Sequence, residues 1–159
     1  MDRCYKVSRA FLKLLAGQES IPLKRDYSLT WERIHSLGTA RAGAILSARR
    51  GVDIELGYTA GVLHDFGRIV TGKNENHAAL GYKPVRDFLG GLKLFREEEI
   101  EEISLAVKNH GRKDLVGSPL DEIAKDGDIL DTHFLGIRLR TERHYQRLAE
   151  IQKELNLKA

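Results

Sequence analysis

The chain has 159 residues, of which 42% are hydrophobic and 31% are charged, a composition typical of a soluble domain and unlike that of disordered or collagen-like chains. Its net charge of +3 is the small difference between 26 basic and 23 acidic residues, so it gives little support for a nucleic-acid partner. The single cysteine, Cys4, excludes an internal disulfide bond and a cysteine-based zinc site.

The length is close to that of one domain, which predicts a single domain over residues 1–159. No apolar run approaches the roughly 20 residues that cross a bilayer, and the N-terminal residues show no signal-peptide pattern. We therefore predict a cytoplasmic protein without a membrane partner.

Apolar residues recur at helical spacing along the whole chain, whereas alternating strand patterns are nearly absent. The sequence therefore predicts an all-α protein. The expected helices cover about residues 2–16, Ser28 or Thr30 to Arg50, Asp53 to Gly67, His77 to about Gly90, 96–110, Ser118-Pro119 past Leu130, and about 141–155. Pro84 should kink the helix that begins at His77 or mark a second start.

The segment from Gly57 to Arg68 is a run of small and apolar residues interrupted by a His64-Asp65 pair. We expect Gly67 to end this helix as a left-handed cap. Burying an imidazole beside a carboxylate costs roughly several kcal/mol unless other groups pair with them. The pair therefore indicates a site to which other parts of the chain contribute.

Two of the expected helices carry a stripe of small residues beside a histidine. The first stripe is His35, Gly38, Ala42 and Ile45, and the second is Ile54, Gly57, Gly61 and His64. Small side chains let two helices approach closely, so we expect these faces to pack on one another around a shared polar centre.

Six side chains that can bind metal lie at helix ends or beside small-residue faces, namely His35, His64, Asp65, His77, His110 and Asp128. Histidine and carboxylate are the ligands expected for zinc, manganese, iron, cobalt or nickel. Two such ions about 3.5–4 Å apart need a bridging carboxylate, and Asp65 is the natural candidate.

The same residues give the chain a resemblance to the HD-domain superfamily of metal-dependent phosphohydrolases. The family pattern of a histidine, a His-Asp pair and a later aspartate is matched by Trp-Glu-Arg-Ile-His35, Leu-His64-Asp65-Phe-Gly and Gly-Asp128-Ile-Leu-Asp. The members that hold two metals have two further histidines, matched here by Asn-His77 and Val-Lys-Asn-His110-Gly.

The resemblance covers about residues 29–135 and implies a helical bundle of the HD type with two divalent transition-metal ions (Fe, Mn, Zn, Co or Ni). Asp128 is preferred to Asp126 and Asp131 as the last ligand, because the family places its aspartate just before an Ile-Leu-Asp type of ending.

The resemblance also implies hydrolysis of a phosphoester of a nucleotide or a related small phosphate. The metals would activate a water beside Asp65 for in-line attack on phosphorus. We assign catalytic roles to Asp65 and Arg68, since Arg68 could neutralise charge on the phosphate. Arg41, Arg68 and Lys73 are the candidates for substrate binding; the alternative for each is a weak surface ion pair.

Other polar residues are given no role in the site. Arg140, Arg143 and Arg147 are interpreted as a solvated face of the last helix, because no aromatic residues interleave with them as in a nucleic-acid platform. His133 and His144 fit no ligand position and are interpreted as surface or structural residues.

Three alternatives stay open beside the phosphohydrolase. Some members of the superfamily use the same ligand set with iron to activate oxygen, so the chain could be a di-iron oxygenase. It could also be a non-catalytic sensor domain that binds metal or nucleotide, or a structural domain without metal.

Overall fold

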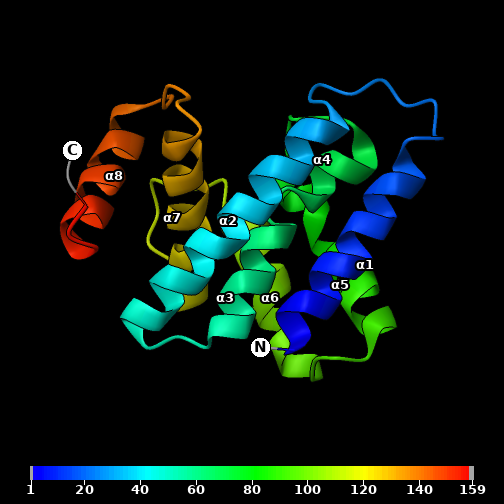
Figure 1. Cartoon of the computed structure of the whole chain (residues 1–159), viewed down its shortest axis with the longest axis horizontal. Coiled ribbons are helices and arrows are strands. Elements are labelled where there is room, and N and C mark those ends of the chain that lie inside the picture. Colours follow the sequence, from blue (N-terminus) through cyan, green and yellow to red (C-terminus); the bar gives the residue numbers. More distant parts are fainter. Residues whose placement is uncertain (1, 158–159) are drawn as a thin grey trace.

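The computed structural model describes residues 2–157, which form eight α-helices and no strand (Figure 1). The helices are α1 (Asp2–Gln18), α2 (Leu29–Arg50), α3 (Ile54–Leu63), α4 (Phe66–Thr71), α5 (His77–Leu92), α6 (Glu97–Asn109), α7 (Pro119–Phe134) and α8 (Glu142–Glu154). The predicted all-α class is therefore confirmed. No described helix is long and apolar enough to cross a membrane.

Local sequence signals set most of the helix ends. The Ser28 side chain accepts a hydrogen bond from the amide of Trp31 at the start of α2, and Gly51 ends that helix in a left-handed conformation with φ 69°. Asp53 caps α3, and Ser118 caps α7 with Pro119 in its first turn. These predicted starts and stops are confirmed.

The helix that starts at Asp53 does not run to Gly67 as predicted. It ends at Leu63, and His64 and Asp65 form a break before the short helix α4. Gly67 lies inside α4 and does not have a left-handed conformation. The glycine instead allows α5 to pack closely, since a Cβ there would lie 2.6 Å from the amide nitrogen of Gly81 and still closer to the carbonyl oxygen of His77. The predicted cap is therefore wrong.

Helix α5 runs through Pro84 as one element, so the predicted second start is wrong. The turn that precedes Pro84 lies at the surface, with Leu80 47% exposed. Solvent can therefore hydrogen-bond the backbone group that proline leaves without a helical partner.

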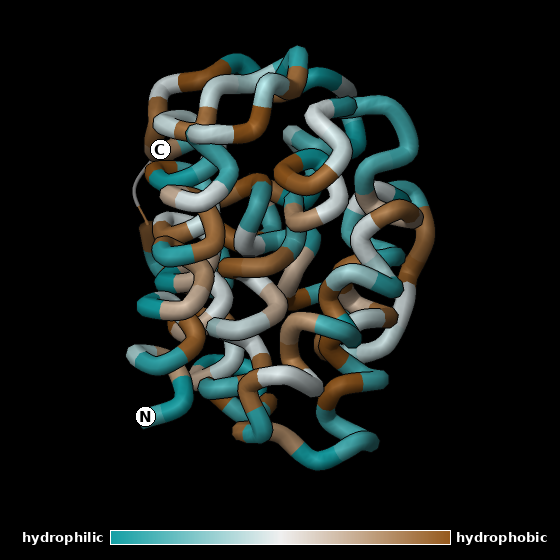
Figure 2. Tube along the Cα trace, turned by 90° about the vertical axis from the view of Figure 1, so that its right-hand side faces the viewer, coloured by the Kyte–Doolittle hydropathy of each residue, from teal (hydrophilic) through white to brown (hydrophobic). Residues whose placement is uncertain are grey.

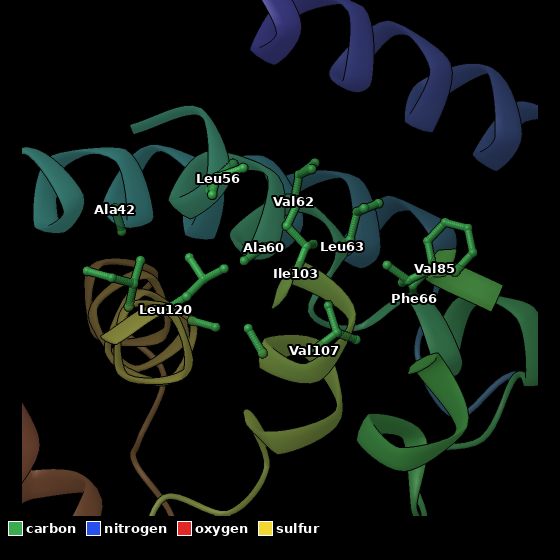
Figure 3. Packing of buried hydrophobic residues seen from close by; sticks show 14 of the residues in the cluster. Ala42, Leu56, Ala60, Val62, Leu63, Phe66, Val85, Ile103, Val107 and Leu120 are labelled. Atoms are coloured by element: carbon green, nitrogen blue, oxygen red, sulfur yellow. The ribbon is translucent and has the colours of Figure 1, made fainter. Parts of the chain in front are cut away.

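The core lies where α2, α3, α6 and α7 meet. Figure 3 shows side chains of all four helices converging there, among them Ala42, Ala60, Ile103 and Leu120. Along the chain, hydrophobic and hydrophilic stretches alternate (Figure 2), whereas α3 in the middle of the bundle is buried along most of its length. Helices α1 and α8 lie at opposite edges of this bundle (Figure 1).

Helices α2 and α3 approach closely, as their small residues predict. A Cβ on Gly61 would lie 2.7 Å from the carbonyl oxygen of Thr39, and one on Gly43 would lie 2.6 Å from that of Gly57. Ile45 is not part of the buried stripe, since it is 56% exposed. At 100° per residue it lies about 80° away from His35 around the helix, which places it beside the interface.

Candidate metal centre

Side chains from five segments of the bundle converge on one polar centre. His35 comes from α2, the His64-Asp65 pair from the break between α3 and α4, and His77 from the start of α5. The other two contributors are His110, which caps the C-terminal end of α6, and Asp128, which lies in α7. The structure thus brings together all six residues that the sequence proposes as ligands.

The first half of the centre consists of His35, His64 and Asp128. The Nε2 atoms of the two histidines are 3.2 Å apart, and His35 Nε2 lies 3.1 Å from Asp128 Oδ1. One oxygen of Asp65 faces this group, with Oδ2 3.0 Å from His64 Nε2 and 3.7 Å from His35 Nε2.

The second half consists of His77 and His110, whose Nε2 atoms are 3.1 Å apart. The other carboxylate oxygen of Asp65, Oδ1, lies 3.0 Å from His77 Nε2 and 3.6 Å from His110 Nε2. Each oxygen of Asp65 therefore faces a different pair of histidines, which is the arrangement that a carboxylate bridging two ions requires.

The outer ring nitrogens of all four histidines are already hydrogen-bonded. In three of them Nδ1 donates to the backbone carbonyl oxygen three residues earlier, namely Gly61 for His64, Asn74 for His77 and Val107 for His110, at 2.6–2.8 Å. His35 lies inside a helix, and its Nδ1 is 2.7 Å from Asp131 Oδ2 instead. These bonds leave every Nε2 facing the centre, where its lone pair can bind an ion once that nitrogen carries no proton.

The sequence matches the HD-domain family over residues 33–133. The chain belongs to the HD-domain family. The HD fold is also seen in the crystal structure of a predicted HD superfamily hydrolase from an uncultured Thermotogales bacterium, with a TM-score of 0.62 and 19% sequence identity over 93% of this chain and 88% of that one. At this identity the likeness shows the fold alone. No curated protein matches the sequence.

The donor set of this HD domain fits a divalent metal. Two groups, His35 with His64 and Asp128, and His64 with Asp65 and His110, each place three candidate ligand atoms within 4.8 Å of one another. Imidazole nitrogens and carboxylate oxygens suit zinc, iron, manganese, cobalt or nickel. Four of the six side chains are buried, and those of His77 and Asp128 are each 18% exposed, so the centre is largely enclosed but open on one side to the cavity.

Asp131 supports the centre from outside it. Its carboxylate occupies the space beside Gly38, where a Cβ would overlap it, and from there it reaches His35. The small residue next to His35 therefore admits the partner that orients the imidazole.

We expect Asp131→Ala to weaken metal binding about 10- to 100-fold, because His35 loses the acceptor that fixes its tautomer and ring orientation. Competition with a chelator would measure the change. Asp114→Ala, at an exposed position near the cavity, serves as the control. Equal metal affinity in Asp131→Ala and the wild type would contradict this role.

Arg68 is buried against the centre instead of extending toward solvent. Its Nε and one terminal nitrogen contact the two oxygens of Glu32 at 2.7 and 3.1 Å, and it also bonds Asp65 Oδ2 and Asn74 Oδ1. The ring of Tyr27 covers its face, with the guanidinium carbon 4.3 Å from the ring centroid. Four of its five N–H donors are thus engaged, so the observed contacts favour a role in holding Asp65.

Arg41 and Lys73 are not brought into the cavity at the centre. Arg41 is exposed among Tyr5, Ile45 and Tyr58 on another face, because six residues of helix place it about 240° around α2 from His35. The structure therefore gives no support to its predicted part in substrate binding, which stays a prediction. Lys73 is exposed and precedes Asn74, which does line the cavity, so its role stays a prediction.

The segment after α7 contributes cavity residues that sequence reasoning missed. Arg138, Arg140 and His144 line the cavity, so His144, which was given no role in the site, lies beside it without being one of the proposed ligands. Gly136 has φ 71°, and this left-handed turn leads the chain back over the centre. His133 is exposed, as predicted.

The three arginines near the C-terminus do not form one solvated stripe. Arg140 precedes α8 and donates to the hydroxyl of Tyr27 at 2.8 Å, while Arg147 is buried and pairs with Asp126 at 2.8 Å. Arg143 pairs at the surface with Glu150. Asp126 is thereby occupied, and Asp131 contacts the outer nitrogen of His35, so Asp128 is the member of this acidic group that faces the Nε2 atoms of the centre.

Charges around the centre set its ionisation. Burial would raise the pKa of Asp65, but His64 and Arg68 outweigh it and hold that pKa well below its usual range. Burial likewise opposes ionisation of Asp128, but the charge of Lys113 and a hydrogen bond that His35 donates keep its pKa well below its usual range. Both carboxylates are therefore charged at neutral pH.

The histidines shift in opposite directions. Burial opposes protonation of His35, but hydrogen bonds with Asp128 and Asp131 raise its pKa to about 10. Burial lowers the pKa of His110 to about 4. In the metal-free protein His35 thus carries a proton that an ion must displace, whereas His110 is neutral.

We expect the metal-free protein to be most stable near pH 6.5. Between pH 4 and 6.5 the unfolded chain binds a proton at His110 more tightly than the folded chain does, so the free energy of unfolding rises with pH. Between pH 6.5 and 10 the folded chain binds a proton at His35 more tightly, so the free energy of unfolding falls with pH. Urea unfolding at pH 5, 6.5 and 9 would measure this. A steady rise in stability up to pH 9 would contradict it.

Proposed function

We propose that the protein is a metal-dependent phosphohydrolase that cleaves a phosphoester of a nucleotide or a related small phosphate. The observation that carries the proposal is the placement of Asp65, whose two oxygens face two separate histidine pairs. That placement supports a site for two divalent ions and not only one.

The chain offers a ligand set for each ion. His35, His64, Asp128 and Asp65 Oδ2 would hold one ion, and His77, His110 and Asp65 Oδ1 would hold the other. When bound, such ions lower the pKa of a water and act as Lewis acids toward a phosphoryl oxygen.

The cavity above the centre suits an anionic substrate. Its volume of about 320 Å³ lies at the lower end of the range for small-molecule sites. The carboxylates that line it are the centre's own Asp65 and Asp128, while the other charged side chains in its wall are basic: Arg68, Lys113, Arg138 and Arg140. These cations would offset the charge of a phosphate group and its neighbours.

One wall of the cavity is aromatic. Trp31 stacks on His35 with ring centroids 5.0 Å apart, and Tyr27 follows at 6.0 Å from Trp31. Ile129, Ile137 and Leu139 add apolar surface. An aromatic and apolar wall beside a basic one supports a substrate that joins a phosphate to a ring, as a nucleotide does.

Metal analysis of protein purified without added metal tests the proposal, followed by a panel of phosphoesters with the ion that is found. We expect a transition metal, hydrolysis of at least one nucleotide, and loss of metal in His64→Ala and Asp128→Ala. Full metal content in both variants would contradict the site. Oxygen uptake by the iron-loaded protein without phosphoester hydrolysis would favour the oxygenase instead.

A further inference from the structure

Lys113 is a buried cation beside the centre to which the function proposed above gives no specific part. It lies in the segment after α6, and only 8% of the residue is exposed. Its Nζ donates to Asp128 Oδ2 at 2.6 Å and to the carbonyl oxygen of His110 at 3.1 Å. The oxygen that it holds is the one turned away from His35, so Lys113 fixes Asp128 from the opposite side.

Lys113 has a hydrogen-bond donor to spare. A lysine ammonium has three N–H donors, and the bonds to Asp128 and His110 use two of them. Nζ has no other partner among residues 2–157, and Lys113 lines the cavity. The third donor is therefore available to a ligand that enters the cavity.

The other cations of the cavity are less suited to this task. Arg68 has most of its donors engaged by Glu32, Asp65 and Asn74. Arg140 is exposed and bonds the hydroxyl of Tyr27. Arg68 keeps one N–H, but it is held by two carboxylates, Glu32 and Asp65. Lys113 pairs with Asp128 alone and keeps one of its three N–H donors free.

The backbone that carries Lys113 is held in place from α8. Arg147 Nε donates to the carbonyl oxygen of Lys113 at 2.8 Å, and Arg147 is itself buried and paired with Asp126 and Glu122 at 2.8 Å. A cation fixed in this way needs little reorganisation when a charged ligand arrives, and such preorganised groups stabilise developing charge most effectively.

We propose that Lys113 is a substrate-contacting catalytic residue: two of its N–H groups hold Asp128 and the end of α6, and the third binds a non-bridging oxygen of the phosphoryl group under attack. This rests on the proposed phosphohydrolase function. A cation in that position binds the phosphate product as well as the substrate, so inorganic phosphate is a suitable probe.

Phosphate binding to protein saturated with Mn²⁺ tests the proposal by calorimetry, after metal content has been measured for each variant. We expect the Kd for phosphate to rise about tenfold to a hundredfold in Lys113→Met and Lys113→Gln, the range for a lost charge-assisted hydrogen bond. Lys113→Gln keeps an amide donor for Asp128, so it separates the loss of charge from the loss of support for that carboxylate. Lys113→Arg should recover part of the affinity.

Lys108→Met is the matched control, because Lys108 is an exposed lysine of α6 outside the cavity. Its phosphate affinity should equal that of the wild type. Wild-type affinity in Lys113→Gln at full metal content would overturn the proposal, as would a metal-loaded wild type that binds no phosphate. If instead the proposed phosphohydrolase function were wrong and the role of Lys113 right, phosphate affinity would still depend on Lys113, but no phosphoester would be hydrolysed.

Discussion

If the proposed two-ion phosphohydrolase site forms, Asp65→Asn is expected to reduce the metal content from two ions per chain to one at most and to lower phosphoester hydrolysis by at least about a thousandfold. An asparagine has one oxygen, so it can face either the His35–His64 side or the His77–His110 side, and its amide group would repel the second ion. Stabilisation of the reacting charge by a metal is worth several kcal/mol, and each 1.36 kcal/mol is a factor of ten in rate.

Elemental analysis and steady-state kinetics on the same preparation would measure both effects of Asp65→Asn. The control is Asp114→Asn, which makes the same chemical change at an exposed aspartate. Two ions per chain with activity within tenfold of the wild type would show that Asp65 does not bridge.

Gly67→Ala is expected to destabilise the protein by about 3 kcal/mol or more and to remove His77 from the centre. The added Cβ would collide with backbone atoms of His77 and Gly81, and backbone cannot move aside as a flexible side chain can. The start of α5 must therefore shift away from α4. Because His77 is the first residue of α5, the second half of the centre should lose its ligand before the first half does.

Gly90→Ala provides the comparison for Gly67→Ala, since Gly90 also lies in a helix but has no atom within 4 Å of an added Cβ. Alanine there should stabilise the protein by up to about 1 kcal/mol, through its higher helix propensity. Thermal unfolding and metal content would be measured for both variants. If Gly67→Ala were as stable as Gly90→Ala, the close contact of α4 with α5 would not be essential.

The features predicted well from the sequence depend on neighbouring residues or on an ordered motif. Ser28 and Ser118 cap their helices through bonds to amides three residues away, so a few letters of sequence suffice. The six ligands are proposed because histidines and aspartates at helix ends or beside small-residue faces are unusual, and because their order matches a known pattern.

The features that were missed depend on contacts between distant segments. Gly67 was interpreted as a cap because nothing near it in the sequence shows that α5 will pack against it. Lys113 follows His110 by three residues without any motif, and only its contact with Asp128 marks it. His144 reaches the cavity because the chain turns back at Gly136, a change of direction that helical periodicity does not report.

The bonds from histidine Nδ1 to carbonyl oxygens three residues earlier join ligand geometry to helix integrity. The carbonyl groups of Gly61 and Val107 belong to the last turns of α3 and α6, where carbonyl oxygens lack the regular amide partner four residues later. The Gly61 oxygen also accepts a long bond, at 3.5 Å, from the amide of His64. Fraying of the last turn of α3 therefore also releases the imidazole of His64, and fraying of the last turn of α6 releases that of His110. By linkage, an ion that needs both imidazoles in place opposes local opening at two helix ends that are far apart in the sequence.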